Sequence, residues 1–318
     1  MMKSIIAISN LIKDHQLQNV KETASDYQVV LAEDLTEDDY SHIEVLYGFD
    51  RAVVDKITAT KNNQLRWLQL HTAGTNQVPD ELWEEKQVTI TTMSGIHATP
   101  IMETVYGYLL MFYRGLDYFY QEQSEAHWGR YRDLKSLDDK TILLYGTGHI
   151  AQKIAEVGHA MDARVWGVNT TGHDAPHFDQ TYSQESVLDV LDQADVVINT
   201  LPGTNATEKL FDADFFQRVK PGIVFINIGR GQAVDEKALL EAVQSERVSH
   251  AGLDVFDTEP LPSDHPFWQE PRIFVTPHIS GTVEHFADEC YRIFQQNLNS
   301  YLETGQPTIN VVDKEKRY

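Results

Sequence analysis

Short apolar runs alternate with longer stretches of helical periodicity along the whole chain. The runs that we predict to be strands are residues 4–9, 27–32, 43–48, 66–70 and 88–91 in the first part, and residues 141–146, 163–169, 195–200, 222–229, 250–256 and 272–277 in the second. Strands that alternate with helical segments are typical of parallel sheets covered by helices. The pattern therefore predicts an α/β protein with two sheets.

The segment between the two groups of strands, from Pro100 to about Tyr120, is predicted to be one helix. Its apolar residues surround the whole helix: Ile101, Val105, Tyr108, Leu109, Phe112, Leu116 and Phe119. A helix that is apolar on every side must be buried on every side. We expect one face to cover the sheet and the rest of this 100–120 region to meet a second copy of the chain. A last helix, about residues 282–302, is expected to return the chain to the first domain.

Composition excludes several classes of function. The chain has 318 residues, enough for two domains, and its apolar content of 42% is ordinary for a globular protein. A net charge of −22 argues against nucleic acid, whose binding depends on cationic side chains. The most apolar tract, residues 105–113, is too short to cross a membrane. A single cysteine, Cys290, excludes an internal disulfide framework and predicts a cytoplasmic location.

A glycine turn follows the strand predicted at 141–146, in the segment TILLYGTGHIAQKIAEVG (141–158). Gly146 permits the tight turn, Gly148 lets the backbone approach a pyrophosphate, and the small Ala151 allows close packing of the next helix. Backbone amides at the start of that helix, around His149 and Ile150, can face the anion. Because the turn lies between a strand and a helix in a repeating αβ pattern, it predicts a dinucleotide site.

The end of the next strand bears on the choice between NAD and NADP. An NAD site usually has Asp or Glu about 20 residues after the glycines, but this chain has Asn169 there, 23 positions after Gly146 (146 to 169). Without that carboxylate a 2′-phosphate meets no repulsion, and Thr170, Thr171 and backbone amides can bind it. No arginine or lysine accompanies them, so the sequence does not decide between the two cofactors and slightly favours NADP.

Three polar residues follow the ends of later predicted strands. Arg230 lies in NIGRGQ, Glu259 in DVFDTEP and His278 in TPHISG. Ligands of open α/β sheets gather at the carboxyl ends of the strands. These three side chains can therefore converge, although they are far apart in the sequence.

Together these motifs resemble the D-isomer-specific 2-hydroxyacid dehydrogenase family over essentially the whole chain. The resemblance includes the glycine turn, LPGTNATEKL (201–210), the linker helix with Met102 and Glu103, and the Arg-Glu-His series with gaps of 29 (230 to 259) and 19 (259 to 278). It implies two domains: a doubly wound Rossmann cofactor domain, 99–283, inserted in a discontinuous flavodoxin-like substrate domain, 1–98 plus 284–318.

The resemblance also assigns roles to residues. Arg230 would bind the carboxylate of a 2-keto acid through its planar donor fork, and Gly229 and Gly231 would leave room for the nicotinamide and substrate. His278 would give a proton to the carbonyl oxygen during reduction, and Glu259 would orient the imidazole and favour its charged form. Asp254 would hold the nicotinamide carboxamide. Further expected cofactor contacts are Thr200, Leu201, Pro202, Thr207, Ile228, Ser280 and Gly281.

On the substrate side, LHTAGTNQVP (70–79) resembles the family loop whose amides hold the substrate carboxylate, here through Ala73, Gly74 and Thr75. We interpret His71 and His97 as cap or surface residues, and Trp128 as an interface residue. The 13 histidines form no close cluster with cysteine or acidic residues, so no metal site is expected.

The expected activity is the NAD(P)-dependent reduction of small 2-keto acids, such as glyoxylate or hydroxypyruvate, by a homodimer. Two alternatives stay open. A 3-phosphoglycerate dehydrogenase would call for cations near residues 50–75, where Arg51, Lys61 and Arg66 are present but not clustered. A nucleotide-sensing, corepressor-like binding protein would bind the cofactor without turnover.

Overall fold

The computed structural model describes residues 3–130 and 133–315, and it divides the chain into two compact units. The first unit joins Met1–Ile96 to Val283–Tyr318, and the second is His97–Thr282. The first is therefore discontinuous in sequence. Within the described ranges, no helix has both the length and the apolarity that a membrane span requires.

The first unit is built on a parallel sheet with strand order β2-β1-β3-β4-β5, which is the flavodoxin-like order. Its strands are β1 (Ile5–Ile8), β2 (Gln28–Leu31), β3 (Ile43–Tyr47), β4 (Trp67–Gln69) and β5 (Thr89–Thr91). Its helices are α1 (Asp14–Thr23), α2 (Arg51–Ala59), α3 (Asp80–Glu84) and α9 (Phe286–Thr304), with 3₁₀ turns η1 (Ala32–Asp34) and η2 (Asp39–His42).

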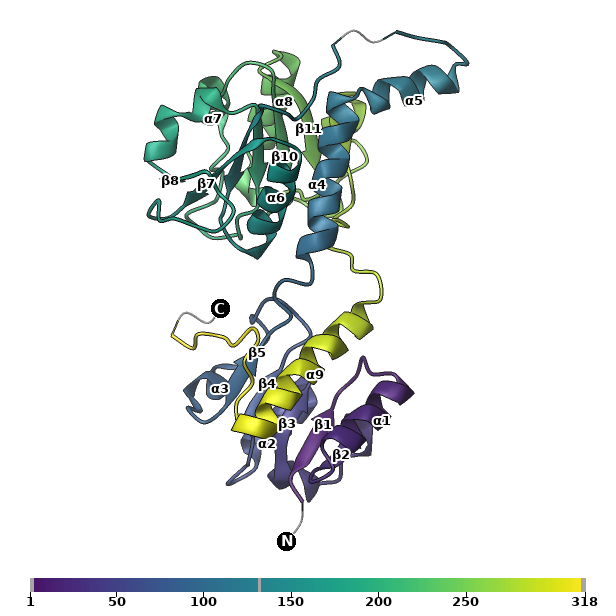
Figure 1. Ribbon diagram of the computed structural model, residues 1–318, viewed down its shortest axis with the longest axis vertical. Helices are drawn as coiled ribbons and strands as arrows, with labels where there is room; N and C mark the ends of the chain where they lie inside the picture. The colour runs from purple at the N-terminus through teal and green to yellow at the C-terminus, as the bar shows by residue number, and fades with distance from the viewer. Residues whose placement is uncertain (1–2, 131–132, 316–318) are drawn as a thin grey trace. The chain divides into compact units, whose positions relative to one another are not determined.

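Helices on both faces of this sheet explain its continuous apolar runs. Successive strand side chains point to opposite faces, and all four residues of β1 are buried. Ile5 packs in a cluster with Ile57 of α2, whereas Ile6 packs in another with Phe294 of α9. Figure 1 shows α9, from the end of the chain, beside α1. The two helices are joined at their first turns, where Lys13 Nζ lies 2.7 Å from Asp288 Oδ2.

The second unit is built on a parallel sheet with strand order β12-β11-β10-β9-β6-β7-β8. Its strands are β6 (Thr141–Tyr145), β7 (Arg164–Asn169), β8 (Gln180–Ser183), β9 (Val196–Asn199), β10 (Ile223–Asn227), β11 (Val248–Leu253) and β12 (Ile273–Val275). Its helices are α4 (Ala98–Tyr113), α5 (Leu116–Ser124), α6 (His149–Ala160), α7 (Ala213–Arg218) and α8 (Glu236–Gln244), with 3₁₀ turns η3 (Ser186–Asp189), η4 (Leu191–Gln193), η5 (Gly231–Ala233) and η6 (Pro266–Gln269).

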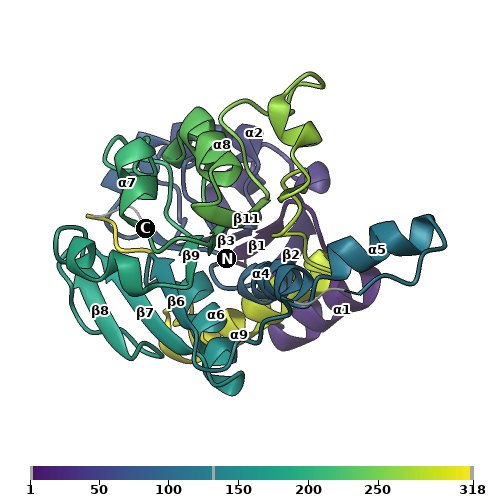
Figure 2. The ribbon, with the colours of Figure 1, turned by 90° about the horizontal axis from the view of Figure 1, so that it is seen from above.

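Two apolar layers sandwich this second sheet. Helices α4 and α6 pack on one face, and α7 and α8 on the other (Figure 2). The strand order reverses between β6 and β9, and such a reversal is where doubly wound folds bind nucleotides, at the carboxyl ends of the strands. The chain is thus an α/β protein in which a Rossmann-type unit is inserted into a flavodoxin-like one.

The 100–120 region differs from the single buried helix that we expected. Helix α4 ends at Tyr113, and α5 begins after Gly115, whose φ of +60° is left-handed and stops the helix. Nor is the region buried on every side, because Leu110 and Leu116 are exposed. Strand β8 was also missed, because it is a polar strand at the edge of the sheet.

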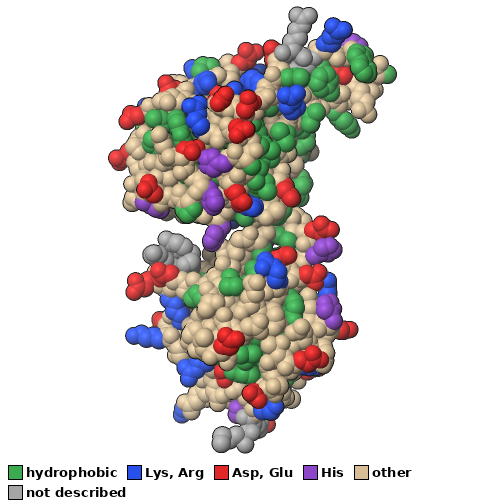
Figure 3. All heavy atoms as spheres, in the orientation of Figure 1, with side chains coloured by type: hydrophobic (Ala, Val, Ile, Leu, Met, Phe, Trp, Pro, Cys, Tyr) green, Lys and Arg blue, Asp and Glu red, His purple; other side chains and the backbone are tan. Residues whose placement is uncertain are grey.

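Acidic side chains are spread over the face of the molecule that Figure 3 shows. On the face seen in Figure 3, Asp and Glu side chains are scattered and interspersed with Lys and Arg. On this face the distribution fits a solvated acidic surface, and no single charged patch is seen among the described residues.

Candidate active site

The glycine turn of the second unit has the geometry of a phosphate cradle. Gly146 has a φ of +105°, and a β-carbon there would overlap the Thr200 hydroxyl. A β-carbon at Gly148, in contrast, would meet nothing within 4 Å, so this stretch of backbone faces open space. Helix α6 starts at His149 with no side-chain cap, and Ala151 in its first turn is fully buried. These residues fit a dinucleotide pyrophosphate.

The neighbouring loop, after β9, is stabilised by its own side chains. Thr200 Oγ1 donates to the Tyr145 carbonyl at 2.8 Å, and Leu201 N donates to Asn199 Oδ1 at 3.0 Å. Thr207 is buried, and its hydroxyl donates to the Pro202 carbonyl at 2.8 Å. The Thr207 hydroxyl therefore helps to shape the loop, a role in addition to the cofactor contact that we expected.

Asn169, at the end of β7, organises the loop where the adenosine ribose of a dinucleotide is expected. Its Oδ1 accepts from the backbone amides of Thr171, Gly172 and His173, at 3.3, 2.7 and 3.1 Å. Its Nδ2 donates to the His173 carbonyl at 2.8 Å. The carboxamide therefore acts mainly as the internal support of residues 171–173.

Glycines flank Arg230 because other backbone segments lie against them. A β-carbon at Gly229 would come within 2.7 Å of the Leu201 carbonyl oxygen, and one at Gly231 would overlap the carbonyl of Phe256. We expected these glycines to leave room for the nicotinamide and substrate. In the structure they allow the end of β10 to pack against the loops that follow β9 and β11.

A pair of buried amides shapes the turn that carries Arg230. Asn199 Nδ2 donates to Asn227 Oδ1 at 2.9 Å, and Asn227 Nδ2 donates to the Arg230 carbonyl at 3.2 Å. The Arg230 side chain is exposed, and its Nη1 donates to the Gly229 carbonyl at 2.6 Å. A guanidinium has five N–H donors, so Arg230 retains donors for an anionic ligand.

His278 and Glu259 form a direct pair after the ends of β12 and β11. His278 Nδ1 lies 2.7 Å from Glu259 Oε2, and Glu259 Oε1 accepts from the Phe256 amide at 3.0 Å. Burial alone raises the pKa of Glu259, but hydrogen bonds from His278 and the Phe256 amide, with the charges of His278 and Arg230, outweigh it and hold that pKa below its usual range. Arg230, Glu259 and His278 thus belong to one electrostatic site, as expected from the sequence.

Asp254, the residue after β11, is fully buried. Its carboxylate accepts from Thr276 Oγ1 at 2.5 Å and from the amides of Ile279 and Ser280 at 2.9 Å each. Ser280 and Ile228 are buried as well. Both oxygens of Asp254 are therefore engaged inside the unit, which adds a structural role to the expected contact with a carboxamide.

In the first unit, the expected substrate loop follows β4. Ala73 and Gly74 are exposed, and a β-carbon at Gly74 would meet nothing within 4 Å. Thr75 is buried, and its carbonyl accepts from the Val78 amide at 3.0 Å. The exposed backbone of residues 73–74 is available to a ligand at the carboxyl edge of this sheet.

The interpretation of His71 as a cap or surface residue is wrong. Only 9% of His71 is exposed, its ring lies edge-on to Tyr47 with centroids 4.4 Å apart, and burial lowers its pKa to about 4. The signal for a buried histidine was its place at the end of an apolar strand. His97 precedes α4 without capping it, and its Nδ1 instead lies 2.8 Å from the Gly281 carbonyl oxygen.

Comparison with known proteins identifies the family of the chain. Residues 106–280 match the model of the D-isomer specific 2-hydroxyacid dehydrogenase NAD binding domain. The chain belongs to the D-isomer specific 2-hydroxyacid dehydrogenase family. As a member it is an NAD(P)-dependent dehydrogenase that acts on 2-hydroxy or 2-keto acids.

Three similar proteins illustrate this membership of the D-2-hydroxyacid dehydrogenases. A glyoxylate/hydroxypyruvate reductase A of Serratia proteamaculans is 31% identical over 68% of each chain. An uncharacterized protein in the proB 3′ region of Corynebacterium melassecola is 30% identical over 55% of this chain, and the match spans 58% of that relative. The crystal structure of a phosphoglycerate dehydrogenase from Lactobacillus plantarum aligns over 98% of this chain and 100% of its own, with 37% identity and a TM-score of 0.60.

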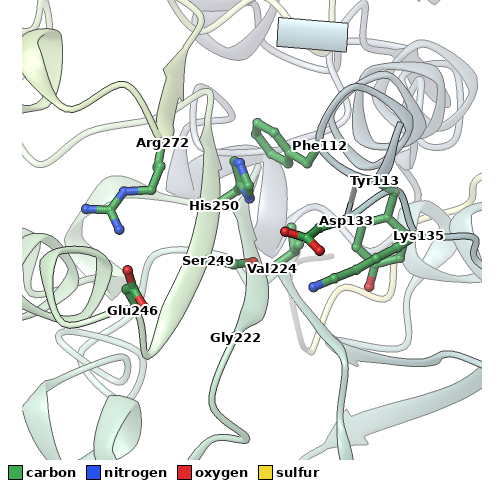
Figure 4. A pocket seen from close by; sticks show the side chains of 10 residues that line it. All are labelled: Phe112, Tyr113, Asp133, Lys135, Gly222, Val224, Glu246, Ser249, His250 and Arg272. Carbon is green, nitrogen blue, oxygen red and sulfur yellow. The ribbon is translucent and has the colours of Figure 1, made fainter. Parts of the chain in front are cut away.

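One cavity of this dehydrogenase lies apart from the candidate active site. It has a volume of about 450 Å³, and it is lined by Gly222, His250 and Arg272, among others (Figure 4). These residues lie near the amino ends of β10, β11 and β12, whereas Arg230, Glu259 and His278 follow the carboxyl ends. The cavity is therefore at the opposite edge of the sheet and belongs to a different surface.

Proposed function

We propose that the chain reduces small 2-keto acids, such as glyoxylate or hydroxypyruvate, to D-2-hydroxy acids. The observation that carries this proposal is the His278–Glu259 pair, with Nδ1 and Oε2 2.7 Å apart and the Arg230 charge acting on the same carboxylate. An acid–base imidazole and a guanidinium beside one dinucleotide cradle are the groups that this reduction needs.

In the proposed reaction, Arg230 binds the substrate carboxylate and draws electron density from the adjacent keto group. Glu259 holds His278 through Nδ1 and stabilises the imidazolium, which leaves Nε2 to protonate the keto oxygen as it becomes a hydroxyl. When bound, the reduced nicotinamide supplies the hydride to C2. Ala73, Gly74 and Thr75 are the proposed further contacts of the carboxylate.

The same proposal assigns the cofactor contacts. The amides of Gly148, His149 and Ile150 hold the pyrophosphate at the start of α6. Thr170 and Thr171 face the adenosine ribose. NADP is slightly favoured over NAD because Asn169 is neutral. The further proposed contacts of the cofactor are Thr200, Leu201, Pro202, Ile228, Ser280 and Gly281.

The test is a panel of 2-keto acids assayed with NADH and with NADPH, with the chirality of each product determined. We expect turnover of glyoxylate or hydroxypyruvate, D-products where the product is chiral, and a loss of roughly 100- to 10,000-fold in kcat for His278→Gln. In an Arg230→Lys variant KM should rise and kcat should fall, because an ammonium cannot bind a carboxylate through two parallel hydrogen bonds. Normal turnover by His278→Gln would contradict the mechanism.

A 3-phosphoglycerate dehydrogenase is the second candidate, because the similar structure from Lactobacillus plantarum carries that name. Among the cations considered for a phosphate, Arg51 is already paired with Asp55, with Nε and Oδ1 2.7 Å apart. 3-Phosphohydroxypyruvate in the same panel distinguishes the two substrates. A corepressor-like sensor would bind the cofactor tightly and reduce none of the panel.

We also propose that the protein is a cytoplasmic homodimer formed through the 100–120 region. Large apolar side chains remain exposed there in the single chain, including Leu116 at 53% and Tyr120 at 75%, and Trp128 just beyond them is 93% exposed. Such residues are expected at an interface. Light scattering of the purified protein tests the dimer, and Leu116→Glu should convert it to a monomer.

A further inference from the structure

The loop that carries His278 is tied to helix α4 through a chain of hydroxyl groups. Thr276 Oγ1 donates to Asp254 Oδ1 at 2.5 Å, and Tyr108 Oη lies 2.5 Å from Thr276 Oγ1. Because the single hydroxyl proton of Thr276 goes to Asp254, its oxygen accepts the proton of Tyr108. The hydrogen bonds therefore run in one direction, from Tyr108 on α4 through Thr276 to the buried carboxylate of Asp254.

Asp254 in turn receives three successive backbone amides of that loop. The amide of His278 donates to the Asp254 carbonyl, that of Ile279 to Oδ1 and that of Ser280 to Oδ2, each at 2.9 Å. One residue thus collects the amides of the whole turn. A change in the position of Asp254 would move the backbone of His278 directly.

His278 depends on this support because its backbone is in an unfavourable conformation. Its φ is +53°, in the left-handed region that residues with a β-carbon rarely adopt. Such a conformation persists where surrounding contacts over-determine it, and the three amide bonds do so here. The conformation sets the direction in which the imidazole leaves the backbone toward Glu259.

Tyr108 is well suited to anchor the chain of hydroxyl groups. Its ring lies directly on Gly252 of β11, where a β-carbon would come within 2.7 Å of Tyr108 Cδ2. Burial, together with the charge of Asp254, raises the pKa of Tyr108 to about 12. The hydroxyl therefore stays protonated and remains a donor at neutral pH.

We propose that Asp254, Thr276 and Tyr108 are positioning residues that hold His278 in its left-handed conformation against Glu259. They act on the proton transfer through His278 and not through the substrate. This inference rests on the proposed acid–base role of His278.

The experiment compares Tyr108→Phe and Thr276→Val with a matched control, Tyr106→Phe. Tyr106 lies on the same helix and is equally buried, but its hydroxyl donates to the Ile154 carbonyl at 2.7 Å, on α6. We expect kcat to fall roughly 10- to 100-fold in Thr276→Val and roughly 3- to 10-fold in Tyr108→Phe, with KM values within about twofold, because a small misplacement of a catalytic group is costly. Tyr106→Phe should keep kcat within about twofold. Thr276→Ser retains the hydroxyl and should restore activity.

A second measurement separates positioning from a general loss of structure. With the His278–Glu259 pair loosened, the pH profile of reduction should move to lower pH in Thr276→Val, and it should stay unchanged in Thr276→Ser and Tyr106→Phe. In the cofactor-free protein, the NMR chemical shifts of the His278 ring should change in Thr276→Val and stay at their wild-type positions in Thr276→Ser and Tyr106→Phe. Arg230, Glu259 and the buried Asp254 are charged groups of this site, and all three remain in every variant.

The proposal is overturned if Thr276→Val and Tyr108→Phe behave like Tyr106→Phe. It is also overturned if their only defect is a higher KM for the cofactor. Normal turnover by His278→Gln would instead refute the proposed function itself, so the two failures are distinguishable.

Discussion

Burial of His71 makes the stability of the first unit depend on pH. Burial lowers the pKa of this imidazole to about 4, and its Nε2 finds no partner among the described residues. In the unfolded chain the same group has a pKa of about 6.5. Between these two values the unfolded state binds the extra proton, so the unfolding free energy falls as the pH falls from about 6.5 to about 4 and is unaffected above that range.

The size of the effect follows from the two pKa values. A difference of about 2.5 pKa units corresponds to about 3 kcal/mol when the pH has fallen to about 4. Most of the change, about 2 kcal/mol, is already present between pH 7 and pH 5. A loss of this size is a large part of the stability of a domain.

The assay is urea unfolding at pH 5, 6 and 7 for the wild type and for His71→Phe, which keeps an aromatic ring against Tyr47 but cannot be protonated. The stability of the wild type relative to the variant should fall by about 2 kcal/mol from pH 7 to pH 5. His15→Ala, at an exposed position of α1, is the control and should leave the pH dependence unchanged. A constant difference between wild type and His71→Phe would refute the reasoning.

Three further changes test the site. Glu259→Gln should move the pH profile of ketoacid reduction to lower pH, because the imidazolium loses its stabilising carboxylate; an unchanged profile would remove the coupling. Gly231→Ala forces a β-carbon into the Phe256 carbonyl and should lower the unfolding free energy by about 1–3 kcal/mol, whereas Gly107→Ala, with open space around it, should not. Asn169→Asp keeps the acceptor of the loop amides but adds charge, so the NADPH-to-NADH ratio of kcat/KM should fall at least roughly tenfold; an equal ratio would argue against a 2′-phosphate site there.

The fold could be predicted largely from apolar runs, because parallel strands buried on both faces leave an uninterrupted signal in the sequence. All eleven predicted strands are present, with ends that differ by a few residues. Strand β8 gave no such signal, since QTYS is only partly buried at the sheet edge. The break after α4 depends on Gly115, and a single glycine inside an apolar pattern does not by itself show whether a helix stops.

The candidate site could be predicted as far as strand ends allow. In a parallel sheet, residues that follow several strands gather at one edge, so the sequence alone brought Arg230, Glu259 and His278 together. It could not show why glycines flank Arg230, because the reason is the backbone of Leu201 and Phe256, which no local pattern relates to them.

The supports of the site were missed for a related physical reason. From the sequence Asp254 was expected only to contact the cofactor, Thr276 looks like an ordinary turn residue, and Tyr108 looks like one more apolar position of a helix. Their importance arises only when β11 and β12 lie side by side, because three backbone amides after β12 then meet Asp254, one at its carbonyl and two at its carboxylate. Periodicity reports burial and spacing, whereas the direction of an imidazole is decided by backbone hydrogen bonds across the sheet. The chemistry of a site can therefore be inferred from residue types, but its precision depends on contacts that only the folded chain creates.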